Sequence, residues 1–312
     1  MKILAALIFF TRLPFWRIKE VPAKYFKRIV PYWPLAGWLT GGIMVGVLWV
    51  TAQVLPVSIA WLLAILSRLL ITGCLHEDGL ADFFDGFGGG TTKERTLAIM
   101  KDSQIGSYGV IGLIGYFLLL FLLLENLPLK LICALVICGD CWSKFCASQI
   151  INYLPYARKE EDSKAKVVYD RMTWQELLTG FICGLFPIVL FLPIDFWLVT
   201  ICPILTFIFL YRLMKHRLQG YTGDCCGATF LLCELSFYLG AAILLYAQEL
   251  LPNKLGLISG LFFGFAFGIA GIASAVLGNM ADRFGIEAVY NVCAFMPLLG
   301  LVTWFLPDLK KV

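Results

Sequence analysis

The sequence is poor in charged residues and has almost no histidine. Charged side chains make up 15% of its 312 residues and hydrophobic side chains 60%, whereas a soluble domain carries about a quarter charged residues. These proportions exclude an ordinary soluble domain and predict an all-α, polytopic membrane protein. Two histidines are too few for a metal site built from imidazoles, and a net charge of +4 gives no sign of a nucleic-acid partner.

The N-terminal segment lacks the pattern of a cleavable signal peptide. Met1–Phe10 is apolar, but Thr11 and Arg12 follow at once, with no small-residue cleavage site. We expect instead a short interfacial helix at about 3–12, followed by a basic segment at the membrane surface.

The apolar segments predict a membrane helix bundle with about seven spanning helices in residues 1–247 and two in residues 248–312. The seven are expected at about 35–54, 57–75, 106–124, 131–151, 174–193, 196–211 and 226–246, and the other two at about 255–277 and 288–306.

Basic residues collect in segments 1–34, 152–173 and 212–224. The positive-inside rule places these segments on the cytoplasmic side, and the number of spans places residues 76–105 there as well. An active site that uses nucleotides is therefore expected on the cytoplasmic side of this multi-pass protein. The partner that the composition predicts is the lipid bilayer. Nothing in the pattern fixes an oligomeric state.

The chemistry concentrates in His76–Gly90, HEDGLADFFDGFGGG. Asp78, Asp82 and Asp85 are spaced i, i+4, i+7, which places them on one face of a helix. Three anions on one face repel one another unless a hard cation neutralises them, and carboxylates suit Mg²⁺ or Mn²⁺. The alternative is a solvated acidic loop between two membrane helices.

The same stretch is rich in glycine. Gly79 and Gly86 lie near the acidic face and leave room for a bulky group to approach. Gly88, Gly89 and Gly90 are expected to end the helix in a turn whose N–H groups meet phosphate oxygens.

A second short helix is predicted just after the glycines. Thr91 and Glu94 fit a capping box. This helix brings four further polar side chains close to the acidic helix: Lys93, Arg95, Lys101 and Asp102.

Four charged residues lie well inside predicted spans, where charge is costly and usually faces a polar cavity. Arg68 is expected to point toward the acidic stretch or a phosphate. Asp140 and Lys144, at i and i+4, are either a self-neutralising pair or part of a substrate site. Glu234 is the single ionised group in its span.

With MKDSQIGSYG at 100–109, the acidic stretch resembles the cobalamin synthase family, adenosylcobinamide-GDP ribazoletransferase. Four other places agree: TRLP at 11–14, PYAR at 155–158, GYTGDCCGA at 220–228, and Glu234 in the helix that follows. The resemblance covers about residues 1–247. It departs at Lys159–Asp162, where the family tends to have glycines.

This resemblance implies an integral inner-membrane transferase that acts in cobalamin biosynthesis and uses Mg²⁺. Adenosylcobinamide-GDP and α-ribazole, or its 5′-phosphate, would combine to give adenosylcobalamin, or its phosphate, while GMP leaves. The pyrophosphate needs a cation, and the attacking ribose hydroxyl needs a base.

The expected roles follow from these needs. Asp78, Asp82 and Asp85 are the expected metal ligands. Asp102 is the expected base, with Asp224 behind it. The expected substrate-binding residues are Arg68, Gly88, Gly89, Arg95, Lys101 and Arg217.

Residues 248–312 have no counterpart in that family. The phrases AQELLPNKLGLISG and LGNMADRFG resemble the last two helices of major facilitator transporters. Nine spans from an inside N-terminus put Lys310 and Lys311 outside, against the positive-inside rule. Either a span is miscounted or the tail is a fusion inserted against its ancestral orientation.

Two other functions compete with the transferase. The pattern Asp82–x–x–Asp85–Gly86 matches the first half of the CDP-alcohol phosphotransferase motif of phospholipid synthesis, but Gly89 and Gly90 stand where that motif has Ala-Arg. Its second half is missing. A transporter would use the intramembrane charges for coupling, but such sites lie near the midplane, whereas the acidic stretch lies between helices.

Overall fold

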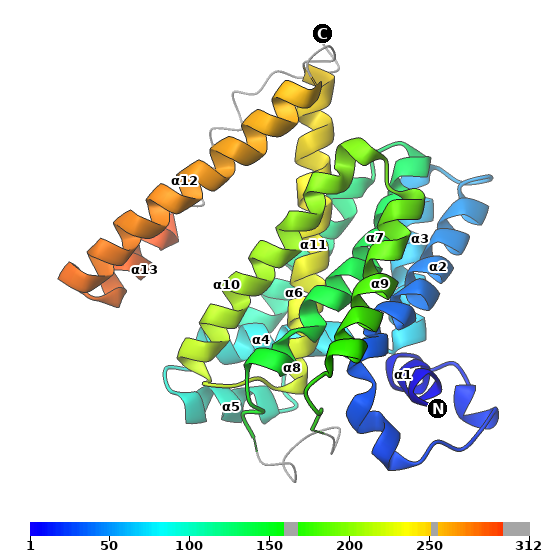
Figure 1. The fold of residues 1–312 in the computed structure, drawn as a ribbon, viewed down its shortest axis with the longest axis horizontal. Helices are drawn as coiled ribbons and strands as arrows, with labels where there is room; N and C mark the ends of the chain where they lie inside the picture. Colours follow the sequence, from blue (N-terminus) through cyan, green and yellow to red (C-terminus); the bar gives the residue numbers. More distant parts are fainter. Residues whose placement is uncertain (159–167, 251–254, 296–312) are drawn as a thin grey trace. The chain divides into compact units, whose positions relative to one another are not determined.

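The computed structural model describes residues 1–158, 168–250 and 255–295 (Figure 1). It comprises two compact units, Met1–Ala242 and Ile243–Val312, which are described separately. The regular secondary structure of the described residues is all helical, with no β-strand, as the composition predicts.

The first unit is a bundle of helices joined by short turns. Its α-helices are α1 (Lys2–Phe10), α2 (Trp33–Thr51), α3 (Val57–Thr72), α4 (Leu75–Gly89), α5 (Lys93–Lys101), α6 (Ser107–Leu124), α7 (Leu129–Ser148), α8 (Ile150–Tyr153), α9 (Trp174–Phe191), α10 (Ile201–Arg217) and α11 (Gly223–Leu250), the last of which runs on into the second unit. Four 3₁₀ segments complete it: η1 (Phe15–Arg17), η2 (Ala23–Arg28), η3 (Val30–Tyr32) and η5 (Ile194–Thr200).

Six stretches of the described residues are long and apolar enough to cross a membrane: Val30–Thr51, Ser107–Leu124, Leu129–Tyr153, Trp174–Phe191, Ile194–Arg217 and Gly223–Leu250. A seventh arises if the bent pair α3 and α4 counts as one span. The seven spans predicted for residues 1–247 fall on these segments, and the predicted interfacial helix is α1.

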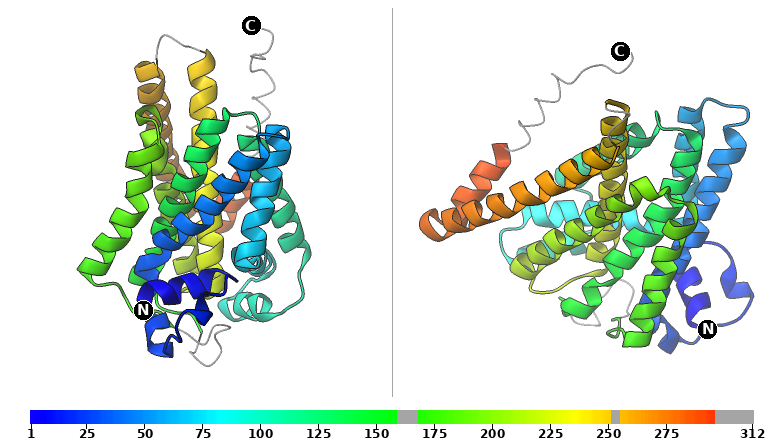
Figure 2. Two further views of the ribbon diagram at one scale, coloured as in Figure 1. Left: turned by 90° about the vertical axis from the view of Figure 1, so that its right-hand side faces the viewer. Right: turned by 45° about the horizontal axis from the view of Figure 1, so that its top comes forward.

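Helix α7 is the centre of the bundle. It packs against α2, α9 and α10, and most of its length is buried. The helices that adjoin the predicted cytoplasmic segments reach the same end of the bundle. Figures 1 and 2 show α1, α4 and α5 at that end. This agrees with the predicted grouping of those segments.

A sharp bend separates α3 from α4. The two helices meet at 90°, and the turn uses two consecutive left-handed residues, Gly73 (φ 64°) and Cys74 (φ 58°). A Cβ at Gly73 would overlap the Arg12 guanidinium, and the Arg12 amide donates to the Ile71 carbonyl at 2.7 Å. The bend turns the acidic helix across the end of the bundle, and Arg12 from TRLP holds it there.

The glycines of α4 leave no open space. A Cβ at Gly79 would lie 3.1 Å from the Cα of Asp224 in α11, and one at Gly86 would overlap the Met100 side chain in α5. The expectation that both glycines make room for a bulky ligand is wrong, because neighbouring helices fill that room.

The short helix after the glycines is α5, and its cap differs from the prediction. The Arg95 amide donates to the Thr92 hydroxyl at 3.2 Å, so Thr92 and not Thr91 is the N-cap. Glu94 is then the second residue of the helix, one position too early to close a capping box with Thr92.

The second unit contains the end of α11, then α12 (Leu255–Phe284) and α13 (Ile286–Phe295). The predicted span at about 255–277 falls within α12. The predicted span at about 288–306 begins in α13, and its remainder lies outside the described residues, as do Lys310 and Lys311. The predicted boundary between 247 and 248 falls inside α11.

Candidate functional site

Two segments from different parts of the chain meet beneath the bundle and place an arginine beside an aspartate. The Tyr221 amide donates to the Pro155 carbonyl at 2.9 Å, and the Ala157 amide donates to the Tyr221 carbonyl at 2.8 Å. This short parallel pairing carries Arg158 to 3.8 Å from the Asp224 carboxylate. The PYAR and GYTGD phrases are therefore one structural unit.

Helices α4 and α11 begin against each other. A Cβ at Gly227 would lie 3.2 Å from the His76 carbonyl, and Gly79 faces the backbone of Asp224. The Thr222 hydroxyl caps α11 by accepting from the Cys225 amide at 3.3 Å. The positive ends of two helix dipoles therefore lie close together and favour an anionic group.

A pocket with a cavity volume of about 130 Å³ lies where these helix starts meet. We call it the α4–α11 pocket. Its charged lining includes Asp78, which is exposed, and the buried Arg158 and Asp224 side chains. Its other principal residues are Phe10, Trp33, His76, Lys144, Tyr156, Tyr169 and Phe230.

Several buried polar atoms of this pocket have no hydrogen-bond partner among the residues that the structure describes. They are both ring nitrogens of His76, the Trp33 Nε1 and the Arg158 Nε. His76 is 3% exposed and is held by rings: it stacks on Phe10, with centroids 5.5 Å apart, and meets Phe230 edge-on at 4.8 Å. Buried polar atoms normally have partners, so these atoms indicate a ligand.

Tyr169 adds a phenol to the pocket wall. Its ring packs edge-on against Trp33, with centroids 5.8 Å apart. Burial raises the pKa of the Tyr169 phenol well above its ordinary value, and the neighbouring Cys226, Tyr221 and Tyr156 raise it further. The phenol therefore stays protonated and can donate a hydrogen bond.

A second pocket lies at the other end of α4. We call it the α4–α6 pocket, and Asp85, Gly89, Arg95 and Asp102 are among its lining residues. Asp102 is exposed, and its carboxylate accepts from the Gln104 amide at 3.0 Å. The two predicted bases therefore lie in different pockets, Asp224 in the first and Asp102 in the second.

The three predicted metal ligands have different surroundings. Asp78 is exposed, Asp82 is half-buried and Asp85 is 6% exposed. One oxygen of Asp85 accepts from the Gly106 amide at 2.7 Å, and the other accepts from the Gly109 amide at 2.8 Å. These bonds cap the start of α6.

No three His, Cys, Asp or Glu side chains within the described ranges lie close enough together to hold a metal ion. The expected site of three α4 carboxylates is therefore not preassembled, because Asp85 turns its oxygens to the α6 backbone. Asp78 and Asp82 stay as predicted ligands.

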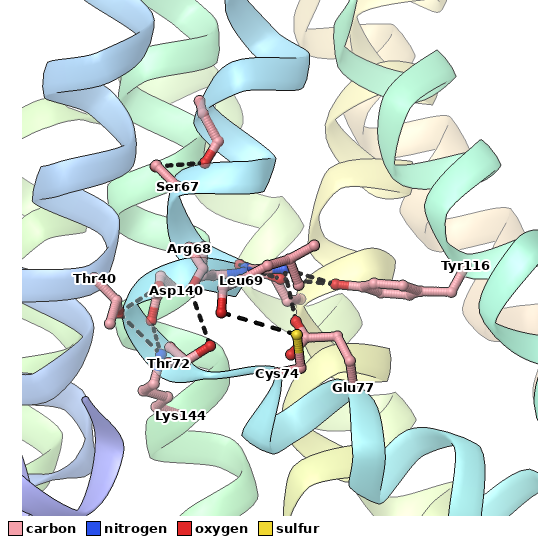
Figure 3. A network of polar contacts seen from close by, with 12 residues as sticks. Thr40, Ser67, Arg68, Leu69, Thr72, Cys74, Glu77, Tyr116, Asp140 and Lys144 are labelled. Atoms are coloured by element: carbon pink, nitrogen blue, oxygen red, sulfur yellow. Dashed lines mark hydrogen bonds and ion pairs between the residues drawn. The ribbon is translucent and has the colours of Figure 1, made fainter. Parts of the chain in front are cut away.

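Arg68 is not a lining residue of the α4–α11 pocket, and Figure 3 shows it in a polar network with Tyr116. Its Nη1 donates to both Glu234 oxygens at 2.7 Å, and its Nη2 donates to the Tyr116 hydroxyl at 2.8 Å. The Tyr238 hydroxyl donates to Glu234 at 2.9 Å, and Glu77 lies 3.9 Å from Arg68. Arg68 does point toward the acidic helix, as predicted, but a role in phosphate binding does not fit this geometry.

Asp140 and Lys144 form the predicted ion pair, which is fully buried. Asp140 also accepts from the Thr40 hydroxyl at 2.8 Å. The Lys144 Nζ lies 3.9 Å from the centre of the Phe230 ring, and Lys144 lines the α4–α11 pocket. The prediction of a self-neutralising pair is confirmed. Lys144 also lines the α4–α11 pocket, as the alternative prediction of a substrate site would require.

The remaining predicted substrate ligands gather at the end of α4. Gly88 and Gly89 lie within the helix, so its end presents carbonyl groups and disfavours phosphate. Arg217 donates to two of those carbonyls, Phe87 and Gly90. Lys101 is exposed at the end of α5. A phosphate-binding glycine turn therefore does not fit this geometry.

Sequence reasoning missed several pocket residues. His76 and Arg158 stood inside phrases quoted for the resemblance but received no role. Trp33 and Tyr169 carried no signal, because they lie 136 positions apart and only the fold brings their rings together.

The chain resembles known proteins over most of its length. A family model described as cobalamin-5-phosphate synthase matches residues 2–243. A protein called adenosylcobinamide-GDP ribazoletransferase from Shewanella amazonensis is 38% identical over 259 residues, which cover 79% of this chain and 96% of that protein. One of the same name from Leptothrix cholodnii is 36% identical over 252 residues, covering 75% of this chain and 92% of its own. No solved structure matches.

Proposed function

The chain belongs to the cobalamin-5-phosphate synthase family, and on that premise we propose that it is a membrane-embedded adenosylcobinamide-GDP ribazoletransferase. It joins adenosylcobinamide-GDP to α-ribazole or α-ribazole 5′-phosphate in the assembly of the nucleotide loop. A ribose hydroxyl forms a new P–O bond at the phosphorus next to cobinamide, the bond to GMP breaks, and the hydroxyl proton passes to a base.

The length of the match carries this proposal. Relatives of that name align over more than nine-tenths of their own length, and the family model spans the first unit nearly from end to end. The phosphotransferase of phospholipid synthesis and the transporter have no comparable support.

We assign the base to Asp224, which reverses the order suggested by the sequence. Asp224 shares its pocket with Asp78 and lies 3.8 Å from Arg158. Arg158 also donates to the Leu97 carbonyl at 3.2 Å, which fixes its position. A carboxylate beside a fixed cation, between two helix N-termini, suits a step in which a hydroxyl attacks a phosphorus. Asp102 faces the other pocket.

We place Mg²⁺ at Asp78 and Asp82. Magnesium is usually bound through one or two carboxylates, with substrate phosphates and water completing its shell. Two acids one helical turn apart fit that donor set without a third protein ligand. When bound, the ion neutralises charge on the pyrophosphate and the leaving GMP. Asp85, the third acid of the predicted site, caps the start of α6 and is not assigned to the ion.

We propose that the protein lies in the inner membrane and that this site opens to the cytoplasm. The basic segments 1–34 and 212–224 lie at the same end of the bundle as α4 and α5, and positive segments stay inside. Adenosylcobinamide-GDP would then reach the site from the compartment that holds nucleotides.

The test is a reaction with purified protein in lipid vesicles, supplied with adenosylcobinamide-GDP, α-ribazole and Mg²⁺. Chromatography should show adenosylcobalamin and GMP in equal amounts. Chelation should stop the reaction, and added Mg²⁺ should restore it. Asp224→Asn should lose activity by at least ~10²-fold, whereas Asp195→Asn, at the other end of the bundle, should not. Absence of product from folded wild type would refute the proposed reaction.

A further inference from the structure

The wall of the α4–α11 pocket combines aromatic faces with hydrogen-bond donors that lack partners. The Trp33 Nε1 and the Arg158 Nε can only donate, and both His76 ring nitrogens lack partners. An imidazole has at least one N–H donor. A buried donor without a partner is unfavourable. The group that occupies this pocket therefore offers acceptor atoms and a flat apolar body.

We propose that the α4–α11 pocket receives the heteroaromatic base of the acceptor nucleoside, and that His76 donates a hydrogen bond to a ring nitrogen of that base. This inference rests on the proposed function, which takes α-ribazole as the acceptor. The base of α-ribazole is a dimethylated benzimidazole, with two fused rings, two methyl groups and one ring nitrogen whose lone pair is free.

The walls match such a ring. Phe10 and Phe230 flank His76, and Trp33 stands edge-on to Phe10 with centroids 5.5 Å apart. Lys144 fixes one wall, because its ammonium lies over the Phe230 ring and is tied to Asp140. Aromatic groups prefer edge-on and offset neighbours of this kind.

Guanine, the other base in the reaction, suits this wall poorly. It presents an N–H and an amino group that need acceptors, and the unsatisfied groups here are mainly donors. The pocket's two carboxylates, Asp78 and Asp224, are assigned to the ion and to the hydroxyl proton. With the benzimidazole inside, the attached ribose lies toward Asp224.

The first experiment separates the two substrates. The KM for α-ribazole and the KM for adenosylcobinamide-GDP are measured for wild type and for His76→Phe, which keeps a ring and removes both nitrogens. Losing one hydrogen bond in a buried site should raise the KM for α-ribazole about tenfold and leave the other KM within about twofold. His216→Phe, at the exposed second histidine, is the matched control and should change neither.

The second experiment changes the ligand. A riboside of dimethylindole has a C–H group where the benzimidazole has its free ring nitrogen. Wild type should prefer α-ribazole by about tenfold in kcat/KM, and His76→Phe should lose that preference. Trp33→Phe removes another buried N–H of the pocket and should keep most of the preference for α-ribazole. A merely structural role for His76 would lower both rates equally.

The following results would overturn the assignment of the pocket to the benzimidazole or the proposed function. Equal use of the two ribosides by wild type overturns the inference even if His76→Phe fails to fold. A raised KM for adenosylcobinamide-GDP alone would assign the pocket to guanine and also overturn it. A wild type that makes no adenosylcobalamin from the natural pair instead defeats the proposed function, which is a distinct result.

Discussion

The two ends of α4 carry the same dipeptide, Asp78–Gly79 and Asp85–Gly86. Each glycine lets a neighbouring helix approach, α11 at the first and α5 at the second. The aspartates differ. Asp78 is exposed at a pocket with unsatisfied donors, whereas the oxygens of Asp85 accept two backbone amides.

This difference separates acids that act on substrate from acids that hold the fold. Helical spacing makes the two aspartates equivalent, because residues seven apart share a face. The neighbours decide between them. The start of α6 has orphan amides that need an acceptor, and Asp85 supplies it. Asp78 instead lines the α4–α11 pocket, on the side where the proposed substrate phosphates would bind.

The strongest test of this contrast is Asp78→Asn. The change removes the charge but keeps the size, so activity in the adenosylcobalamin assay should fall by at least ~10²-fold, as for other lost transition-state charge contacts. The Tm of the purified protein should stay within about 1 °C, because an exposed side chain contributes little to stability. Asp195→Asn is the control. Activity near wild type at saturating Mg²⁺ would remove Asp78 from the site.

At the other end, Asp85→Asn should act mainly on stability. An amide keeps one acceptor oxygen but turns an NH₂ group toward a backbone donor, which costs about 2 kcal/mol. Denaturation in detergent should show this loss, while activity per folded molecule should stay within about threefold. If stability is unchanged and activity falls as far as in Asp78→Asn, Asp85 is a metal ligand, and the contrast between the two ends is mistaken.

The two glycines offer a smaller contrast. In Gly79→Ala the new methyl meets backbone atoms of Asp224, which cannot turn aside, so stability should fall by about 1–2 kcal/mol and turnover should fall with it. In Gly86→Ala the methyl overlaps the buried Met100 side chain and lies 3.3 Å from the Thr96 carbonyl, so stability should fall as well. Turnover per folded molecule should change little, because these contacts do not involve Asp224. Thermal unfolding and turnover of both variants check this. Equal effects on turnover would mean that the position of Asp224 is not sensitive to Gly79.

Much of the fold could be predicted because it depends on local composition. Spanning segments are set by runs of apolar residues, and the acidic helix is set by its spacing and its glycines. Local chemistry also misleads by one residue, as at the α5 cap, where Thr91 and Thr92 are equally good caps by type. In the structure Thr92 takes the extended conformation of an N-cap, and its hydroxyl accepts from the Arg95 amide.

The site was less predictable because its parts are distant in sequence. Arg158 reaches Asp224 only through the backbone pairing of Pro155 with Tyr221. His76 depends on the bend at Gly73, which turns α4 across the bundle. Such long-range contacts leave no periodicity in the sequence, whereas the acids of α4 do.

The smallest effect is expected from removing the tail. Both ends of α4, both pockets and the family match lie within residues 1–243. Membrane helices associate by packing and small-residue contacts, so extra helices can accompany a complete bundle without joining its chemistry. A chain that stops after Leu250, where α11 ends, should keep both KM values and kcat per folded molecule within about twofold, with a lower yield tolerated. The adenosylcobalamin assay on vesicles, normalised to inserted protein, checks this. If the truncated protein inserts but shows no turnover, residues 251–312 belong to the working enzyme. The active site would then extend beyond α4 and its two pockets.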